Sequence, residues 1–425
     1  MLDNPASKRS GTDQVLIADQ HAVVPYHAGK ASAALSKQDR DALAATKAEL
    51  RIQNALQAGI ADDVAGISAA FFETALDALS LNSKIALASD LDCYVDWCLE
   101  NKRTALPARA ETILDYMDAR SRAGAKLATI ERRFASIVKA HRLLEIENDE
   151  LKRQVIRDKL KVIGKRKGKR QRQAEALRHE ESSGTNEQNV SISALIASCP
   201  DTLTGLRDAA LLSAGFDAGL RVSELTAIRV AHIEPAQEGE GVLFIPDSKT
   251  DQEGEGAYAW LSAETMLRIG RWLDEAEITK GVVFRRVHIT RRKAREGETR
   301  KDWVRATSSI RTTQVEPPSA ATATYTVGSN PLTRQGVVKI IRRVIETAWL
   351  DGRIAVKGDD IDAYLSRVST HSLRVGLTQE LIAGGQEGIA IAQALRWTST
   401  STVLRYGAKL RVGSGAAARV LRRTS

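Results

Sequence analysis

Two side chains that can bind an anionic group, His371 and Arg374, lie at the start of the stretch 370–407. They are three positions apart, so a helix would place both on one face. Trp397 and Tyr406 follow within the same stretch. These four residues either converge on a reaction or fill a core, and taken one at a time Trp397 and Tyr406 are more often core residues.

Three further polar residues, Arg221, Glu224 and Lys249, are also not explained by helix packing. Arg221 and Glu224 lie one helical turn apart, where an ordinary surface pair contributes only about 0.2–0.5 kcal/mol. Lys249 lies in a turn-rich connector between two strand-like runs, where a solvated turn lysine is the simpler interpretation. A structural role explains each residue when it is considered alone. It explains all seven residues poorly when they are considered together, so we favour a shared site.

These residue types could together cleave a phosphodiester without a metal ion. A tyrosine can attack phosphorus and form a covalent phosphotyrosine, which conserves the bond energy for rejoining. Two guanidinium groups remain protonated and can stabilise the negative charge that develops on the non-bridging oxygens. A lysine ammonium group, with a pKa of about 10, can give a proton to the departing 5′ alkoxide.

The composition favours a polyanionic partner. The 425 residues suffice for two domains, each with its own core. A formal net charge of +9 points most often to nucleic acid, although a basic protein without such a partner remains an alternative. Three irregularly placed cysteines predict neither a disulfide framework nor a zinc site. No apolar window approaches the ~18 residues of a membrane span, so we expect a cytoplasmic protein with no membrane partner.

Helical periodicity dominates the first part of the chain and predicts a mainly α fold. Residues 1–66 are expected to form an N-terminal arm with one exposed, alanine-rich helix over 36–58. Residues 67–164 have the spacing of four or five helices and are predicted to be a helical DNA-binding domain. A basic and polar linker is expected over 165–189.

The second domain is expected over residues 190–425. Short strand-like runs at 241–246 and 257–261 interrupt its helices, so we expect a mixed α/β domain, mostly helical with a small antiparallel sheet. Residues 285–330 are basic and lack clear periodicity. They predict a long loop, which is either an insertion or a DNA-facing arm.

Basic residues gather at the end of the helical domain. Eleven lysines and arginines lie between 152 and 172 against a single acid, Asp158. Such a run repels itself unless an anion neutralises it, so we predict contacts to DNA phosphates, with a solvated run as the alternative. The predicted DNA-binding residues, in the helix 129–144 and in this run, are Arg132, Arg133, Lys139, Arg142, Lys165, Arg166, Lys167, Lys169 and Arg170.

The order of the seven polar residues resembles the active-site signature of the tyrosine recombinase (phage integrase) family, most closely that of Cre-type site-specific recombinases. The similarity lies in four segments read in order: A-G-L-R-V-S-E-L, S-K-T, T-H-S-L-R-V-G and W-T-S-T-S-T-V-L-R-Y. Each segment is weak evidence by itself, and the four together on a basic two-domain chain are a strong signal. The resemblance extends from about residue 67 to the C-terminus. One departure is Leu395-Arg396, before Trp397, where relatives often have glycine.

The resemblance implies a role for each residue of the signature. Tyr406 would be the nucleophile, and Arg221 and Arg374 would bind the phosphate. Lys249 would be the general acid. His371 would bind the phosphate and help to accept the tyrosine proton, Trp397 would donate its indole N–H, and Glu224 would orient the site.

The resemblance also implies how such a protein acts. It would be an enzyme without a cofactor or metal, acting as a clamp on double-stranded DNA with inverted-repeat half-sites. A homodimer would occupy one site and a homotetramer would exchange strands through a Holliday junction, with the segment after Tyr406 docking into a neighbour. Localisation would be cytoplasmic, on the nucleoid of a bacterium, phage or plasmid host. The alternatives are a catalytically silent DNA-binding protein of this fold, a topoisomerase IB-like enzyme and a telomere resolvase.

Overall fold

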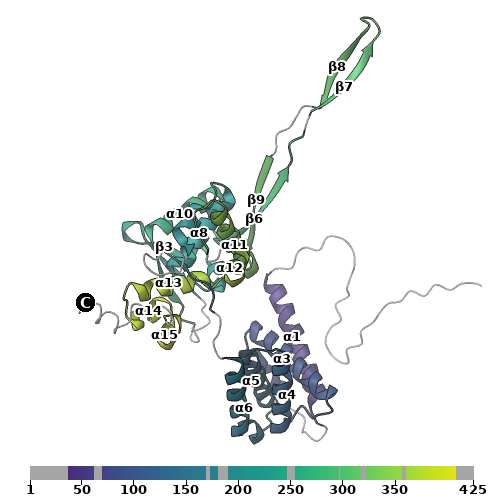
Figure 1. Cartoon of the computed structure of the whole chain (residues 1–425), viewed down its shortest axis with the longest axis vertical. Coiled ribbons are helices and arrows are strands. Elements are labelled where there is room, and N and C mark those ends of the chain that lie inside the picture. Colours follow the sequence, from purple (N-terminus) through teal and green to yellow (C-terminus); the bar gives the residue numbers. More distant parts are fainter. Residues whose placement is uncertain are drawn as a thin grey trace, which may run out of the picture. The chain divides into compact units, whose positions relative to one another are not determined.

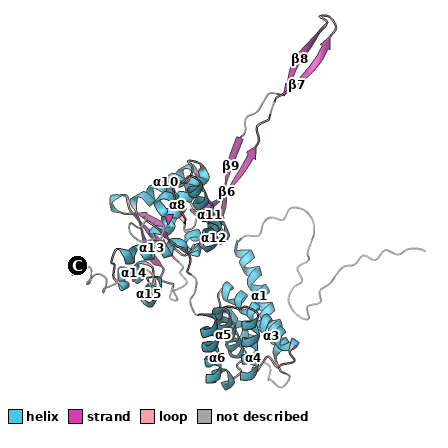
Figure 2. Cartoon of the chain, viewed as in Figure 1, coloured by secondary structure: helices cyan, strands magenta, loops and turns pink. Residues whose placement is uncertain are grey.

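The computed structural model describes residues 37–61, 69–168, 173–179, 190–246, 254–295, 297–316, 322–356 and 360–407 (Figure 1). Helices dominate these residues, and the strands form small sheets (Figure 2), which confirms the predicted fold class. The chain divides between residues 171 and 172 into two compact units. The linker expected over 165–189 spans this division.

The first unit is a bundle of helices around one apolar core. Leu91, Tyr94 and Ile113 are fully buried in this core. Helices α2 to α6 fulfil the expectation of four or five helices within 67–164. The helices of this unit are α1 (Lys37–Gly59), α2 (Ala69–Asp77), α3 (Leu81–Glu100), α4 (Ala110–Arg122), α5 (Leu127–Leu143), the 3-10 helix η1 (Asp149–Lys152) and α6 (Gln154–Lys167).

Helix α1 was expected to be exposed, and it instead packs into the core of the first unit. Ile52 and Leu56 are almost completely buried there. Two ion pairs join α1 to α3, one between Glu49 and Lys84 and one between Arg51 and Asp92. The expectation of exposure was wrong because small alanines fill much of the buried stripe, so the helix shows little hydrophobic contrast in the sequence.

The second unit is built around α8, which contacts α7, α10 and α13. Leu211, Leu212 and Ala214 of α8 are completely buried, as expected for a helix surrounded by others. The elements of this core are β1 (Leu177–Arg178), β2 (Val190–Ser191), α7 (Ile192–Ala197), α8 (Leu203–Asp217), α9 (Val222–Ala227), η2 (Val230–His232), β3 (Ile233–Pro235), η3 (Gln237–Gly239), β4 (Gly241–Ile245), β5 (Ala257–Leu261), α10 (Ala263–Glu275), α11 (Arg334–Leu350) and α12 (Ile361–Arg367), followed by α13 (Ser372–Ala383), α14 (Gly388–Ala394) and α15 (Ser401–Tyr406).

The predicted sheet is present in this unit. Strands β3, β4 and β5 form an antiparallel sheet in that order, with Leu243 of β4 opposite Ala259 of β5. Strands β1 and β2 pair in parallel. Helix α13 lies directly against β1: a Cβ atom on Gly376 would lie 1.6 Å from the carbonyl oxygen of Leu177. An ion pair of 2.8 Å between Arg178 and Glu380 joins the same two elements.

The described residues of the segment expected to be a long loop, 285–330, instead form two pairs of antiparallel strands (Figure 2), which are called the ribbon below. Its strands are β6 (Arg285–Arg292), β7 (Glu298–Val304), β8 (Ser309–Glu316) and β9 (Thr322–Pro331), with β6 paired to β9 and β7 to β8, both antiparallel. The loop prediction was wrong because most side chains of the ribbon are exposed, and an exposed ribbon lacks the alternation of apolar and polar residues that identifies a half-buried strand.

Candidate active site

Arg221 lies immediately before α9 and holds the buried carboxylate of Glu224. The backbone N–H of Arg221 donates to Glu224 Oε2 at 2.9 Å, and Arg221 Nη1 donates to Glu224 Oε1 at 2.8 Å. Burial acts to raise the pKa of Glu224, but the hydrogen bonds from Arg221 and the charge of Arg396 outweigh it and lower this pKa. Glu224 is therefore ionised and fixes the position of the Arg221 guanidinium.

Arg374 lies in the first turn of α13, one turn after His371, as the spacing predicts. Its guanidinium is almost completely buried and donates through Nη1 to the carbonyl oxygen of Gly219 at 2.7 Å and through Nη2 to that of Leu395. Its Nε has no hydrogen-bond partner within the part of the chain that the structure describes. Burial, followed by the nearby charges of Arg221 and Arg396, lowers the pKa of Arg374 to about 9.

Tyr406, at the end of α15, meets both His371 and Trp397. Its Oη lies 2.5 Å from His371 Nε2, and its ring stacks on Trp397 with centroids 5.3 Å apart and an interplanar angle of 12°. The guanidinium carbon of Arg374 lies 5.3 Å from the centroid of the same Trp397 ring. The structure therefore brings α13, α15 and the loop that holds Trp397 together. The charge of Arg221, which is far from them in sequence, also acts on His371 and Arg374.

Burial controls the protonation of this group. It is the main cause that lowers the pKa of His371 to about 4, with further lowering by the charges of Arg374 and Arg221. Burial also raises the pKa of Tyr406, although the positive charge of Arg374 acts against it. At neutral pH the imidazole is therefore neutral and the phenol is protonated, so the hydroxyl can donate its proton to His371 Nε2.

Arg396 is the site residue to which the sequence analysis gave no role. Its Nη2 donates to Glu224 Oε2 at 3.2 Å and to the carbonyl oxygen of Ala218 at 3.1 Å. Its backbone has φ of 54°, in the left-handed region that favours glycine. The signal that could have identified it is its position in the sequence, where a basic residue lies directly before Trp397.

Replacing Arg396 by glycine is expected to slow the strand cleavage predicted from the sequence about tenfold, because Glu224 loses the contact with Arg396 and holds Arg221 less rigidly. Glycine also relieves the left-handed backbone, so the melting temperature should change little. Single-turnover cleavage and thermal unfolding would be measured in parallel. Arg396→Lys, which keeps the charge, is the matched variant and should recover part of the rate; an unchanged rate for Arg396→Gly would contradict the prediction.

The predicted DNA-binding residues of the first unit differ in their contacts: some bind other groups of the protein, and others are exposed. Arg132 lies 2.9 Å and Arg133 3.7 Å from the buried carboxylate of Asp90, so both arginines form ion pairs with it, and the Arg132 side chain is still 49% exposed. Lys167 donates to two backbone carbonyl oxygens, those of Ser121 and Ala125, each at 2.7 Å. Lys165 and Arg166 are exposed near the end of α6.

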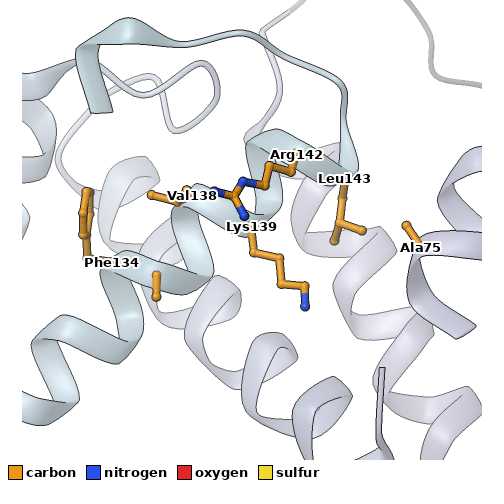
Figure 3. A pocket seen from close by; sticks show the side chains of 7 residues that line it. Ala75, Phe134, Val138, Lys139, Arg142 and Leu143 are labelled. Atoms are coloured by element: carbon orange, nitrogen blue, oxygen red, sulfur yellow. The ribbon is translucent and has the colours of Figure 1, made fainter. Parts of the chain in front are cut away.

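Lys139 and Arg142 lie on α5 and line a hollow of about 500 Å³ with Phe134, Val138 and Leu143 (Figure 3). The hollow combines two cationic side chains with apolar side chains.

Lys249, Lys169 and Arg170 lie outside the described residues. Among the described residues of the chain, no group of three or more His, Cys, Asp or Glu side chains could hold a metal ion. No described helix is long and apolar enough to span a membrane.

The second unit thus combines a mostly helical fold and a small sheet with a group of polar residues in which Tyr406 contacts both His371 and Trp397. Residues 186–411 match the model of the phage integrase family, and the chain belongs to this family. It is 27% identical to an integrase/recombinase XerD homologue of Selenomonas ruminantium, over 76% of this chain and 81% of that protein. It is 25% identical to the Cre recombinase of Escherichia phage P1, over 77% of this chain and 84% of that protein.

A solved structure has the same fold. The XerH site-specific recombinase, in a post-cleavage complex with a palindromic difH substrate, superposes with a TM-score of 0.54 over 88% of this chain and 96% of that one. The sequences are 14% identical in that comparison, so the likeness concerns the fold.

Proposed function

We propose that the chain is a site-specific recombinase that cleaves and rejoins duplex DNA through a 3′-phosphotyrosine intermediate. The observation that carries this proposal is the position of the Tyr406 hydroxyl, 2.5 Å from a neutral imidazole and on the same tryptophan ring as the buried guanidinium of Arg374. A nucleophile, a proton acceptor and an anion-binding group therefore meet at one point.

The chemistry follows from these groups. Tyr406 Oη attacks phosphorus and its proton passes to His371 Nε2, while the bond from phosphorus to the 5′ oxygen breaks and that oxygen takes a proton from Lys249. Arg221 and Arg374 stabilise the charge on the non-bridging oxygens. This role is supported by Nε of Arg374, which has no hydrogen-bond partner among the described residues and so can donate to the phosphate. Rejoining is the reverse attack by a 5′ hydroxyl.

We further propose that both units contact the duplex, so that the protein acts as a clamp on DNA. Two protomers would occupy inverted half-sites and four would exchange strands through a Holliday junction. The exposed Lys165 and Arg166, together with Lys139 and Arg142, are the basic residues of the first unit that we assign to phosphate contacts. Exposed cations are suited to this role, whereas Arg132 and Arg133 already neutralise Asp90.

The experiment that tests the function uses plasmids with one or two copies of a duplex that the protein selects from a random pool. A recombinase yields deletion or inversion products that require two copies. Relaxation of supercoils that is independent of this sequence would favour a topoisomerase IB-like enzyme, and hairpin ends would favour a telomere resolvase. Sequence-specific binding without any covalent adduct would instead identify a catalytically silent DNA-binding protein.

Replacing Lys249 by alanine is expected to slow cleavage of an ordinary phosphodiester by about 10²–10⁴-fold, because the 5′ alkoxide then leaves without a proton. A bridging 5′ sulfur is a good leaving group without protonation, so the same variant should cleave that substrate at nearly the wild-type rate. Single-turnover cleavage of the two substrates makes the comparison. Equal losses on both would remove Lys249 as the general acid.

A further inference from the structure

The ribbon 285–331 carries most of the positive charge excess of this protein. It contains ten lysines and arginines against four acidic residues, a net charge of +6, while the whole chain has +9. The side chains of Arg291, Arg292 and Lys301 are exposed. Within the described ranges, none of these three forms an ion pair, whereas Arg300 is paired to Asp302 at 2.8 Å. The ribbon therefore offers unneutralised cations to solvent.

The shape of the ribbon suits a groove of double-stranded nucleic acid. Strands β6 and β9 pair through seven registered positions, and β7 and β8 form a second antiparallel pair (Figure 1). The major groove of duplex DNA admits a two-stranded ribbon of this kind. Basic side chains along such a ribbon would lie near the phosphates that border the groove.

An exposed apolar pair lies near the turn of the outer hairpin. Trp303 of β7 is directly opposite Ile310 of β8, so both side chains point to the same face, and each is 62% exposed. Lys301 lies two residues before Trp303 and therefore on that face too. Large apolar side chains paired at an exposed position indicate a binding surface rather than a packed core. In the major groove, apolar side chains of this kind can contact the methyl group of thymine.

We propose that the ribbon 285–331 is a DNA-binding arm, whose basic side chains contact phosphates beyond the DNA at the active site and whose Trp303–Ile310 pair contacts bases. This proposal rests on the proposed function, in that the chain must act on DNA. A second copy of the chain is the competing partner for the apolar pair. Charge favours DNA, because a second ribbon would bring the same excess of positive charge to the contact.

The test compares two duplexes that carry the sequence selected by the protein, one with long flanks and one trimmed to the core that still supports cleavage. The double variant Arg292→Gln, Lys301→Gln should bind the long duplex about fivefold to tenfold more weakly, with a salt slope smaller by about 1.8. Its affinity for the trimmed duplex should be unchanged. Trp303→Thr should weaken binding of the long duplex without changing the salt slope, because it removes no charge.

The matched control is Arg40→Gln, Lys47→Gln, which removes two exposed charges from α1. This control variant should show the same difference in affinity between the long and the trimmed duplex as the wild-type protein. Equal affinities and slopes for wild type and both ribbon variants on the long duplex would overturn the proposal. So would a Trp303→Thr variant that binds DNA normally but changes the mass of the DNA-free protein, since the partner is then a second copy. A covalent adduct on the trimmed duplex tests the proposed function separately, because the ribbon variants should still form it.

Discussion

Replacing Tyr406 by phenylalanine is expected to abolish the covalent protein–DNA adduct, with a fall in cleavage of at least about 10⁴-fold. The substitution removes the oxygen that lies 2.5 Å from His371 Nε2 and keeps the ring that stacks on Trp397. DNA binding should therefore remain close to the wild-type level. A nicked duplex that traps the cleaved state, followed by denaturing electrophoresis, measures the adduct directly.

The chain offers a matched control for this experiment in Tyr258, which lies on β5 and is 68% exposed. Tyr258→Phe removes the same hydroxyl from a solvated position and should leave adduct formation unchanged. An adduct formed by the Tyr406→Phe protein would show that another residue attacks the phosphate. In that case the contact between Tyr406 and His371 would be a structural hydrogen bond only.

Replacing Arg374 by alanine is expected to cause two separate losses. Cleavage should fall by about 10²–10³-fold, because one cation at the phosphate is gone. Stability should fall by about 1–3 kcal/mol, because the carbonyl oxygens of Gly219 and Leu395 lose their buried donors. Chemical denaturation measures the second loss, and single-turnover cleavage at a temperature where both proteins are folded measures the first.

Two comparisons separate the chemical effect from the structural one. Arg342 is a partly buried arginine that donates to the carbonyl oxygen of Val368 at 3.2 Å. Arg342→Ala should therefore reduce stability without an equal loss of cleavage. A methylphosphonate in place of the reacting phosphate lacks one charged oxygen, so Arg374→Ala should lose less activity on that substrate. An identical loss on both substrates would contradict a role for Arg374 in charge stabilisation.

The positions of His371, Arg374, Trp397 and Tyr406 were predictable because each lies in a short segment whose residue types and order are informative. Helical spacing placed His371 and Arg374 on one face, and the structure has them at the start of α13. Spacing could not reveal that Arg374 would direct both terminal nitrogens to carbonyl oxygens, since those belong to Gly219 and Leu395, which are distant in sequence.

Other features were missed for identifiable physical reasons. The ion pairs of Arg132 and Arg133 with Asp90 could not be predicted, because nothing local indicates that Asp90 of another helix lies beneath them. Arg396 looked like part of a departure from a glycine position, and its contact with Glu224 depends on how its loop approaches helix α9. Strands β6 to β9 lack apolar alternation because most of their side chains are exposed, so a pattern that measures burial cannot detect them.

The close packing of Gly376 on Leu177 affects how this protein can be dissected. Helix α13 carries Arg374, and the carbonyl of Leu177 occupies the space that any side chain at position 376 would need. Strand β1 is thus a part of the second unit, together with the ion pair from Arg178 to Glu380. A fragment that starts at residue 190 would lack this support under α13. A fragment meant to retain cleavage should instead begin at about residue 172, where the chain passes into the second unit.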